Sequence, residues 1–266
     1  MEFEREFSTG LEQEVSPEAE PRPEKVFLLI RHPSTRMERA IDESDPEQSW
    51  DDIEEDIRID RKGGTMSRSL LDYLTSTTLE KDVIEVDIYT SPAVRAKSLA
   101  ESLEKKLDYE HRRNQNIPVA KKGVYAINQL RELPLKCSIR EVQDCIKAAK
   151  KEGKSPMTKW MESDPERATN ILNNELPRIK ENLAFLQKSP ANINFVVTHR
   201  LVIAFSVWVV QKQEQGEVNE VNKEDLKDIS TIADQIDYTS ITELQQIKGE
   251  LKLGQIGQTS HLSTQS

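Results

Sequence analysis

The chain has 266 residues, of which 36% are apolar and 32% are charged, and its formal net charge at pH 7 is −10. A chain of this length can form one large α/β domain or two smaller ones, and its negative charge argues against binding to nucleic acid or to anionic membranes. No apolar run approaches the length of a membrane span, and the N-terminus lacks the basic-then-apolar order of a signal peptide. The two cysteines, Cys137 and Cys145, fit neither a disulfide framework nor a common zinc spacing, so we expect a protein of the reducing cytoplasm.

The N-terminal part of the chain divides into a tail and the start of a folded domain. Residues 1–24 are rich in glutamate and proline and are predicted to be a disordered acidic tail, followed by a single domain over residues 25–266. Residues 26–30 are continuously apolar, which is typical of a strand buried on both faces. Residues 37–62 contain eleven acids and four bases, so we expect an acidic, solvent-facing insertion loop there, which could be partly helical.

Helix and strand signals alternate in the next part of the chain. Gly63-Gly64 predicts a break, after which Thr65 is expected to cap a helix. A second buried strand is predicted over residues 84–90. Ser91-Pro92 has the residue types of a helix N-cap and a first helical position, and an apolar stripe at helical spacing follows over residues 96–107.

The second half of the chain begins with weaker signals. A short strand is predicted over residues 124–127. Residues 133–165 are irregular by pattern, with short amphipathic pieces around Val142 to Ala149, and they belong with the residues before them to a second insertion over 108–165. A long helix is expected from Pro165 through Leu186, with a kink or a break at Pro177.

The last part of the chain carries the third strong strand, over residues 193–198, followed by an almost wholly apolar helix over 201–210. Residues 239–247 and 251–256 could form a hairpin. Strands that alternate with helices imply a three-layer α/β/α sandwich around a largely parallel mixed sheet. In such sheets ligands lie beyond the carboxyl ends of the strands, so the functional residues are expected there.

The three strong strands end in residues suited to phosphate chemistry. They lead into Arg31-His32-Pro33-Ser34-Thr35, Ser91-Pro92-Ala93-Val94-Arg95-Ala96 and Thr198-His199-Arg200. A neutral imidazole is a good nucleophile near pH 7, and a guanidinium group donates to phosphate oxygens in a planar fork. The sequence contains neither a Walker-type glycine-rich loop nor a compact cluster of metal-ligand residue types. It therefore predicts a phosphate site built from imidazole and guanidinium groups.

These motifs, in this order, resemble those of the histidine phosphatase superfamily, branch 1, which also contains the cofactor-dependent phosphoglycerate mutases. Arg31-His32 matches the start of the family's Arg-His-Gly motif, and residues 91–96 match Ser-Pro-x-x-Arg-Ala without exception. The resemblance runs from about Lys25 to the C-terminus and is loose over the two insertions. Further similar segments are Leu130-Arg131-Glu132, Val196-Val197-Thr198-His199, Tyr238-Thr239-Ser240-Ile241 and Ser260-His261-Leu262.

The resemblance implies a phosphoglycerate mutase-like fold and a hydrolase, namely a metal-independent phosphomonoesterase without a cofactor. His32 would attack phosphorus and become a phosphohistidine, and Glu132 would protonate the leaving oxygen, with Glu141 as an alternative donor. Two guanidinium groups and a second imidazole would bind the phosphate, namely those of Arg31, Arg95 and His199. The candidate substrate contacts are Ser34, Thr35, Arg36 and Arg200.

Two residues beside the expected catalytic groups depart from the family pattern. Pro33 stands where glycine is usual, and Arg200 follows the second histidine where glycine is also usual. Two other functions therefore stay open, a phosphoglycerate mutase-type phosphotransferase and a catalytically impaired member that binds a phosphorylated ligand or protein. Residues 37–39 and 133–135 lack the asparagine and the Tyr-Gly pair that the mutases usually carry, which favours the phosphatase.

The expected partner is a phosphorylated small molecule or a phosphoprotein, and neither nucleic acid nor a membrane. Selectivity for that partner is expected to reside in residues 37–62 and 108–165, where the resemblance is loosest. The oligomeric state is left open by the sequence.

Overall fold

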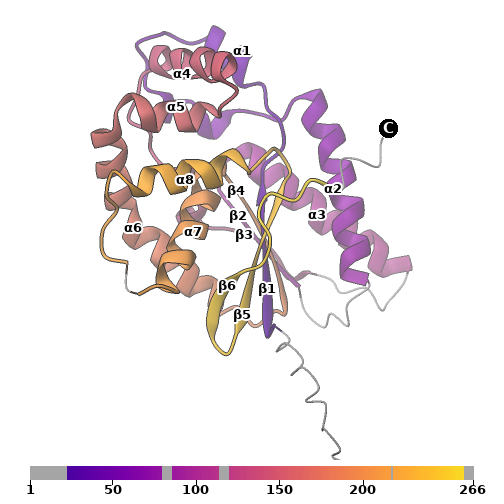
Figure 1. The fold of residues 1–266 in the computed structure, drawn as a ribbon. Coiled ribbons are helices and arrows are strands. Elements are labelled where there is room, and N and C mark those ends of the chain that lie inside the picture. The colour runs from indigo at the N-terminus through magenta and orange to yellow at the C-terminus, as the bar shows by residue number, and fades with distance from the viewer. Residues whose placement is uncertain (1–22, 80–85, 114–119, 217, 261–266) are drawn as a thin grey trace, which may run out of the picture.

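The computed structural model describes residues 23–79, 86–113, 120–216 and 218–260. They contain a six-stranded sheet in the order β3-β2-β4-β1-β5-β6 (Figure 1). β3, β2, β4 and β1 are parallel to one another, whereas β5 and β6 are antiparallel to their neighbours. The strands are β1 (Lys25–Arg31), β2 (Val86–Thr90), β3 (Ala120–Ala126), β4 (Ile193–Thr198), β5 (Ile241–Ile247) and β6 (Glu250–Leu253).

Helices cover both faces of this sheet (Figure 1). The α-helices are α1 (Met37–Asp42), α2 (Arg61–Leu79), α3 (Val94–Arg113), α4 (Ile139–Glu152), α5 (Pro156–Ser163), α6 (Pro165–Gln187), α7 (Arg200–Gln213) and α8 (Asp225–Asp234). Short 3₁₀ helices are η1 (Trp50–Asp52), η2 (Glu54–Asp56) and η3 (Asn128–Leu130). None of the helices in the described residues is both long and apolar enough to cross a membrane.

The side chains of β1 show why the molecule has three layers. Successive residues of a strand point to opposite faces of the sheet. Leu28 and Ile30 belong to the hydrophobic core under α2 and α3, whereas Phe27 and Leu29 belong to the core under α6, α7 and α8. A strand with apolar residues at every position therefore fits only a sheet covered on both faces. The predicted three-layer sandwich around a largely parallel mixed sheet is confirmed.

The acidic segment 37–62 exposes many of its acids to solvent, but it also packs onto the domain, which the sequence did not predict. It contains α1, η1 and η2, and Ile41, Trp50 and Ile57 are buried. Its acids outnumber these apolar residues, and composition alone therefore suggested a solvated loop. The three apolar side chains nevertheless decide where the segment lies, because burying each of them is worth about 1.5–3 kcal/mol.

The glycine pair does not break the chain as predicted, because α2 begins at Arg61 and continues through Gly63 and Gly64. The cap is Asp60 instead of Thr65, since the Asp60 carboxylate accepts from the Gly63 backbone N–H over 2.6 Å. A Cβ atom on Gly63 would lie 2.1 Å from the carbonyl oxygen of Ser34. Glycine is therefore needed here for the close approach of the helix to the loop after β1.

The segment 133–165 forms two regular helices. α4 contains the predicted amphipathic pieces, whereas α5 corrects the prediction of an irregular segment. Ser138 caps α4 in a capping box with Glu141, a signal that the sequence carries at the required spacing. Pro177 lies inside α6 without ending it, because packed residues on both sides of the proline keep the helix in the core. The predicted hairpin exists as β5 and β6, joined at Lys248 and Gly249, which both have positive φ. The predicted acidic tail lies almost entirely outside the described residues.

Candidate active site

The three phosphate-type motifs meet because their strands are neighbours in the sheet. β1 lies beside β4, and the backbone N–H of His32 donates to the carbonyl oxygen of Thr198 over 3.0 Å. β4 also lies beside β2, and the backbone N–H of Ser91 donates to the carbonyl oxygen of Val197 over 2.9 Å. Since the three strands are parallel, the residues that follow them come together at one edge of the sheet.

The hydrogen bonds of His32 define its tautomer. Its Nδ1 lies 2.9 Å from the carbonyl oxygen of Pro33, to which only an N–H can donate, so the lone pair is on Nε2. Nε2 in turn accepts from Nε of Arg95 over 3.2 Å. Burial, followed by the charges of Arg95, His199 and Arg31, lowers the pKa of His32 well below 6.5, so the imidazole is neutral at physiological pH. Pro33 supplies this acceptor although it has no backbone donor.

Arg95 lies at the centre of the site and uses every part of its guanidinium group. Besides Nε on His32, Nη1 donates to the backbone oxygen of Glu54 and Nη2 donates to the Glu54 carboxylate. Nη2 also lies 3.0 Å from Nδ1 of His199. Arg95 and Glu54 are both buried, so this is an ion pair removed from solvent. A carboxylate thus lies against the guanidinium group that was predicted to bind phosphate.

Glu54 is a residue that the sequence analysis missed, because it lies in the segment predicted to face solvent. Asp51, in the same segment, accepts from the backbone N–H groups of Leu135 and Lys136 over 2.9 and 3.0 Å, which ties η1 to the chain after Glu132. The sequence does carry one sign that this segment is packed, namely apolar residues at helical spacing (Trp50, Ile53 and Ile57), which is unusual in so acidic a segment.

His199 connects the two halves of the cluster. Its Nε2 lies 2.8 Å from Oγ of Ser91, and its Nδ1 lies 3.2 Å from Oε2 of Glu132. Nδ1 of His199 thus lies beside Arg95, which can only donate, and beside Glu132, which accepts. If Nδ1 carries a proton it donates to Glu132, and if it does not it accepts from Arg95, so it bonds to only one of them at a time. The ring centroids of His199 and His32 are 5.2 Å apart.

Glu132 is held close to these groups by β4, because Oγ1 of Thr198 donates to the carbonyl oxygen of Leu130 over 2.6 Å. Burial acts to raise the pKa of Glu132, but attraction to His199 and Arg95 and a bond from the Leu133 N–H together hold it below its usual value. Glu132 is therefore ionised at neutral pH in the free protein.

Arg31 and Arg200 add two more cations to the same site. Arg31 donates from Nη1 to the carbonyl oxygen of Ile236 over 3.0 Å, and its guanidinium group lies 3.8 Å from the ring centroid of Tyr238. Burial and the neighbouring charge of Arg200 lower the pKa of Arg31 to about 9, at which it is still protonated at pH 7. Nε of Arg31 and Nε of Arg200 are buried and have no hydrogen-bond partner among the described residues. Both are therefore donors available to an anion.

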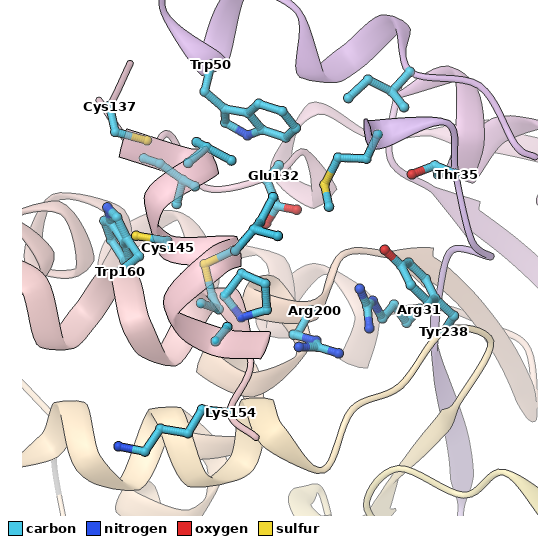
Figure 2. Close-up of a pocket in the computed structure, with 18 of the residues that line it drawn as sticks. Arg31, Thr35, Trp50, Glu132, Cys137, Cys145, Lys154, Trp160, Arg200 and Tyr238 are labelled. Atoms are coloured by element: carbon cyan, nitrogen blue, oxygen red, sulfur yellow. The ribbon is translucent and has the colours of Figure 1, made fainter. Parts of the chain in front are cut away.

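The site opens into a cavity of about 430 Å³ between the sheet edge and the helices α4 and α5 (Figure 2). Of the residues predicted for the site, six line this cavity and His199 is buried behind it. Ser34 instead donates to Asp60 over 2.7 Å, and Arg36 is exposed outside the cavity. Glu141 lies away from the site, in the α4 cap and an ion pair with Arg167. The six lining residues are Arg31, His32, Thr35, Arg95, Glu132 and Arg200.

The cluster also contains a set of metal-ligand residue types. Glu54, Glu132 and His199 each offer one ligand atom, and these atoms lie within 4.8 Å of one another. Arg95 contacts two of the three, Glu54 and His199, and so places a fixed positive charge between them. A divalent cation at this position would be repelled, and we therefore describe the cluster as an ion-pair network.

The strand order and the layers define a phosphoglycerate mutase-like α/β fold, and solved structures share it. Phosphoglycerate mutase from Bacillus anthracis superposes with a TM-score of 0.56 at 17% identity, over 90% of this chain and 95% of that chain. A histidine-to-alanine mutant of phosphoserine phosphatase from Entamoeba histolytica, in complex with phosphoserine, superposes with a TM-score of 0.52 at 17% identity, over 90% of this chain and 99% of that chain. Alpha-ribazole phosphatase from Shigella flexneri superposes with a TM-score of 0.50 at 13% identity, over 88% of this chain and 96% of that chain.

These three proteins are members of the histidine phosphatase superfamily, the family that the motifs resemble. At these identities the likeness is one of fold, and the predicted fold is confirmed by it. No protein-family model and no curated protein matches the sequence.

Proposed function

We propose that the chain is a metal-independent phosphomonoesterase that acts through a phosphohistidine on His32. One observation carries the proposal. The lone pair of His32 Nε2 faces the Arg95 guanidinium group at 3.2 Å, at a sheet edge where His199, Arg31 and Glu132 also meet. A neutral nucleophile surrounded by fixed cationic donors is suited to phosphoryl transfer, because the transferring group spreads negative charge over its oxygens.

Substrate binding would begin with an exchange of anions at Arg95. The phosphate oxygens would replace the backbone oxygen of Glu54 on Nη1 of Arg95 and the Glu54 carboxylate on Nη2, and they would accept from the unpaired Nε donors of Arg31 and Arg200. Arg95 Nε would turn from His32 to the phosphate and thereby release the lone pair of the nucleophile.

In the first chemical step, Nε2 of His32 forms a bond to phosphorus while the ester P–O bond breaks, and the electron pair leaves with the alcohol oxygen. Glu132 gives this oxygen its proton. The low pKa of Glu132 in the free protein is consistent with this role only if the substrate raises it. An incoming phosphate dianion would do so, because it places negative charge beside the carboxylate and competes for His199 and Arg95.

In the second step, water attacks the phosphohistidine and Glu132, now ionised, accepts its proton. The P–N bond breaks, phosphate leaves, and the electron pair returns to Nε2 of His32. The carbonyl oxygen of Pro33 holds the Nδ1 proton in place throughout, so the imidazole regains the same tautomer. The fold neighbours that are named phosphatases and mutases support the broader assignment to phosphatase or phosphotransferase chemistry.

The direct test is hydrolysis of an aryl phosphate in the presence of EDTA, with trapping of an acid-labile phosphoprotein. We expect turnover and labelling by the wild-type chain, and neither by His32→Ala. Labelling that survives in His32→Ala would reject His32 as the nucleophile, and turnover that EDTA abolishes would reject a metal-independent reaction.

A second function, a catalytically impaired member that binds a phosphorylated ligand, is favoured by one observation. The Glu54 carboxylate already lies on Arg95, where the phosphate is expected. If this ion pair is too stable to exchange at the concentrations of the substrate, turnover will be absent although the pocket is intact. Retained binding of vanadate without hydrolysis of any phosphomonoester would support this second function.

A further inference from the structure

The cavity is apolar on the side away from the phosphate-binding groups. α4 and α5 supply most of this part, which also includes an indole ring from η1 (Figure 2). Two of its aromatic rings, those of Trp50 and Trp160, are almost fully buried in the protein yet border the cavity. We call this part the apolar subsite and define it by Trp50, Val142, Ile146, Ala149, Met157 and Trp160.

The apolar subsite and the phosphate-binding groups line one continuous cavity of about 430 Å³. This volume is in the range of ~300–1,000 Å³ that is typical of sites enclosing a whole small molecule. A phosphoryl group bound at Arg95 would leave most of it empty. The occupant of the remainder is therefore the organic part of the same phosphorylated molecule, which has to extend from phosphorus toward α4 and α5.

The charges around the cavity further restrict this organic part. Among the described residues that line it, Glu132 is the only acid, and its carboxylate faces His199. No lining carboxylate is therefore left to pair with an amine such as that of phosphoserine. Two lysines also border the cavity, and neither is free: Lys154 lies 2.6 Å from Glu162, and Lys150 likewise has a partner.

We propose that the substrate is the phosphate monoester of a bulky, uncharged and largely apolar alcohol, whose carbon skeleton lies in the apolar subsite. This inference rests on the proposed phosphatase function. It names a substrate class different from phosphoserine, which the Entamoeba histolytica protein binds in its crystal structure. Each buried methylene group is worth about a fourfold change in affinity, so a naphthyl group should be distinguished strongly from a methyl group.

The first test measures binding without chemistry. Titration calorimetry with the wild-type chain in EDTA would compare 2-naphthylmethylphosphonate with methylphosphonate, which share the same anion. We expect the naphthyl compound to bind at least 30-fold more tightly. Equal affinities would overturn the inference.

The second test uses a matched pair of variants on α4. Ala149 lines the apolar subsite, whereas its neighbour Ala148 does not line the cavity. Ala149→Leu should weaken binding of 2-naphthylmethylphosphonate about tenfold or more and leave methylphosphonate unchanged, and Ala148→Leu should change neither. If Ala149→Leu does not fold, Ile146→Ala serves in its place, because truncation of this half-buried side chain cannot overpack the core. Ile146→Ala should weaken binding of 2-naphthylmethylphosphonate several-fold, and an unchanged affinity would contradict the inference.

The third test separates this inference from the proposed function. The wild-type chain would be assayed on 2-naphthylmethyl phosphate, methyl phosphate and phosphoserine, which all have alcohol leaving groups. We expect the highest kcat/KM for the naphthyl ester. Tight binding of the naphthyl phosphonate without hydrolysis of any ester would reject the phosphatase and keep the apolar subsite. Efficient hydrolysis with preference for phosphoserine would keep the phosphatase and reject the apolar substrate.

Discussion

The carboxylate of Glu54 lies on the guanidinium group of Arg95, and both side chains are buried. The two residues are 41 positions apart and belong to different motifs of the sequence, an acidic insertion and a phosphate-type helix start. In the free protein, Glu54 neutralises the charge of Arg95. Its carboxylate then occupies the position where a phosphate oxygen is proposed to bind. We therefore expect Glu54 to compete with phosphate at the proposed site and to limit how tightly that site binds its ligand.

Replacement of Glu54 should reveal that competition. Glu54→Gln removes the negative charge, and we expect it to tighten binding of vanadate about tenfold or more, measured by titration at constant ionic strength. The same variant should lose about 3–5 kcal/mol of stability in phosphate-free buffer, because the buried Arg95 loses the carboxylate that it contacts directly. Phosphate should then raise its Tm more than it raises that of the wild type.

Glu43→Gln is the matched control for this experiment. Glu43 belongs to the same acidic segment, but its partner Arg39 is an exposed neighbour on α1. The control removes an equal charge from the segment and should change neither vanadate affinity nor stability by more than a few tenths of a kcal/mol. Equal effects of both variants would show that the net charge of the segment, rather than the Glu54–Arg95 pair, controls anion binding.

His32 should make the stability of the protein dependent on pH. Its pKa is well below 6.5 in the folded chain and returns to about 6.5 on unfolding. As pH falls below 6.5, the unfolded chain takes up a proton that the folded chain does not, so stability is lost at up to about 1.4 kcal/mol per pH unit until the folded pKa is reached.

Urea denaturation between pH 7 and pH 5 would measure this effect against His32→Asn, which cannot titrate. We expect the stability of the wild type to fall relative to that of the variant over this interval. The acidic limb of kcat/KM should likewise lie below pH 6.5, since the nucleophile stays neutral there. Parallel stability curves for the two proteins would contradict a lowered pKa at His32.

Glu132 should matter most when the leaving group is poor. Glu132→Gln should reduce kcat/KM for alkyl phosphates by about 10²–10⁴ but reduce the rate of phosphohistidine formation from aryl phosphates much less. Hydrolysis of the intermediate should then be slow, so acid-labile phosphoprotein should accumulate and be visible by rapid quench. Glu141→Gln serves as the control and should leave activity unchanged, because Glu141 caps α4 away from the site. Equal losses on alkyl and aryl esters would exclude Glu132 as the acid.

Two adjacent glycines of α2 should respond oppositely to alanine. Gly63→Ala would force a Cβ to within 2.1 Å of the Ser34 carbonyl oxygen, and we expect a loss of about 1–3 kcal/mol and a displaced loop after β1. In Gly64→Ala, the new Cβ would have no packing neighbour within 4 Å. Because Gly64 is an exposed helical position, we expect this variant to raise the free energy of unfolding by about 0.5–1 kcal/mol. Thermal denaturation would measure both, and destabilisation by both variants would argue that α2 does not pass through this pair as described.

The sequence by itself determined the sheet and the residues that follow its strands. Unbroken apolar runs such as residues 26–30 specify strands buried on both faces, and parallel strands must end at the same edge. His32, Arg95 and His199 could therefore be expected to meet although more than 60 residues separate each from the next. Local chemistry also specified the hairpin of β5 and β6.

The tertiary structure alone decided what lies opposite that edge. The acidic composition of residues 37–62 indicated a solvated loop, yet three apolar side chains pack the segment onto the domain and carry Glu54 to Arg95. The apolar subsite likewise depends on how α4 and α5 pack over the sheet edge, because an amphipathic helix has an apolar stripe whether it faces a core or a cavity. Periodicity is a property of neighbouring residues, whereas a counter-ion or a cavity is made by residues that only packing brings together.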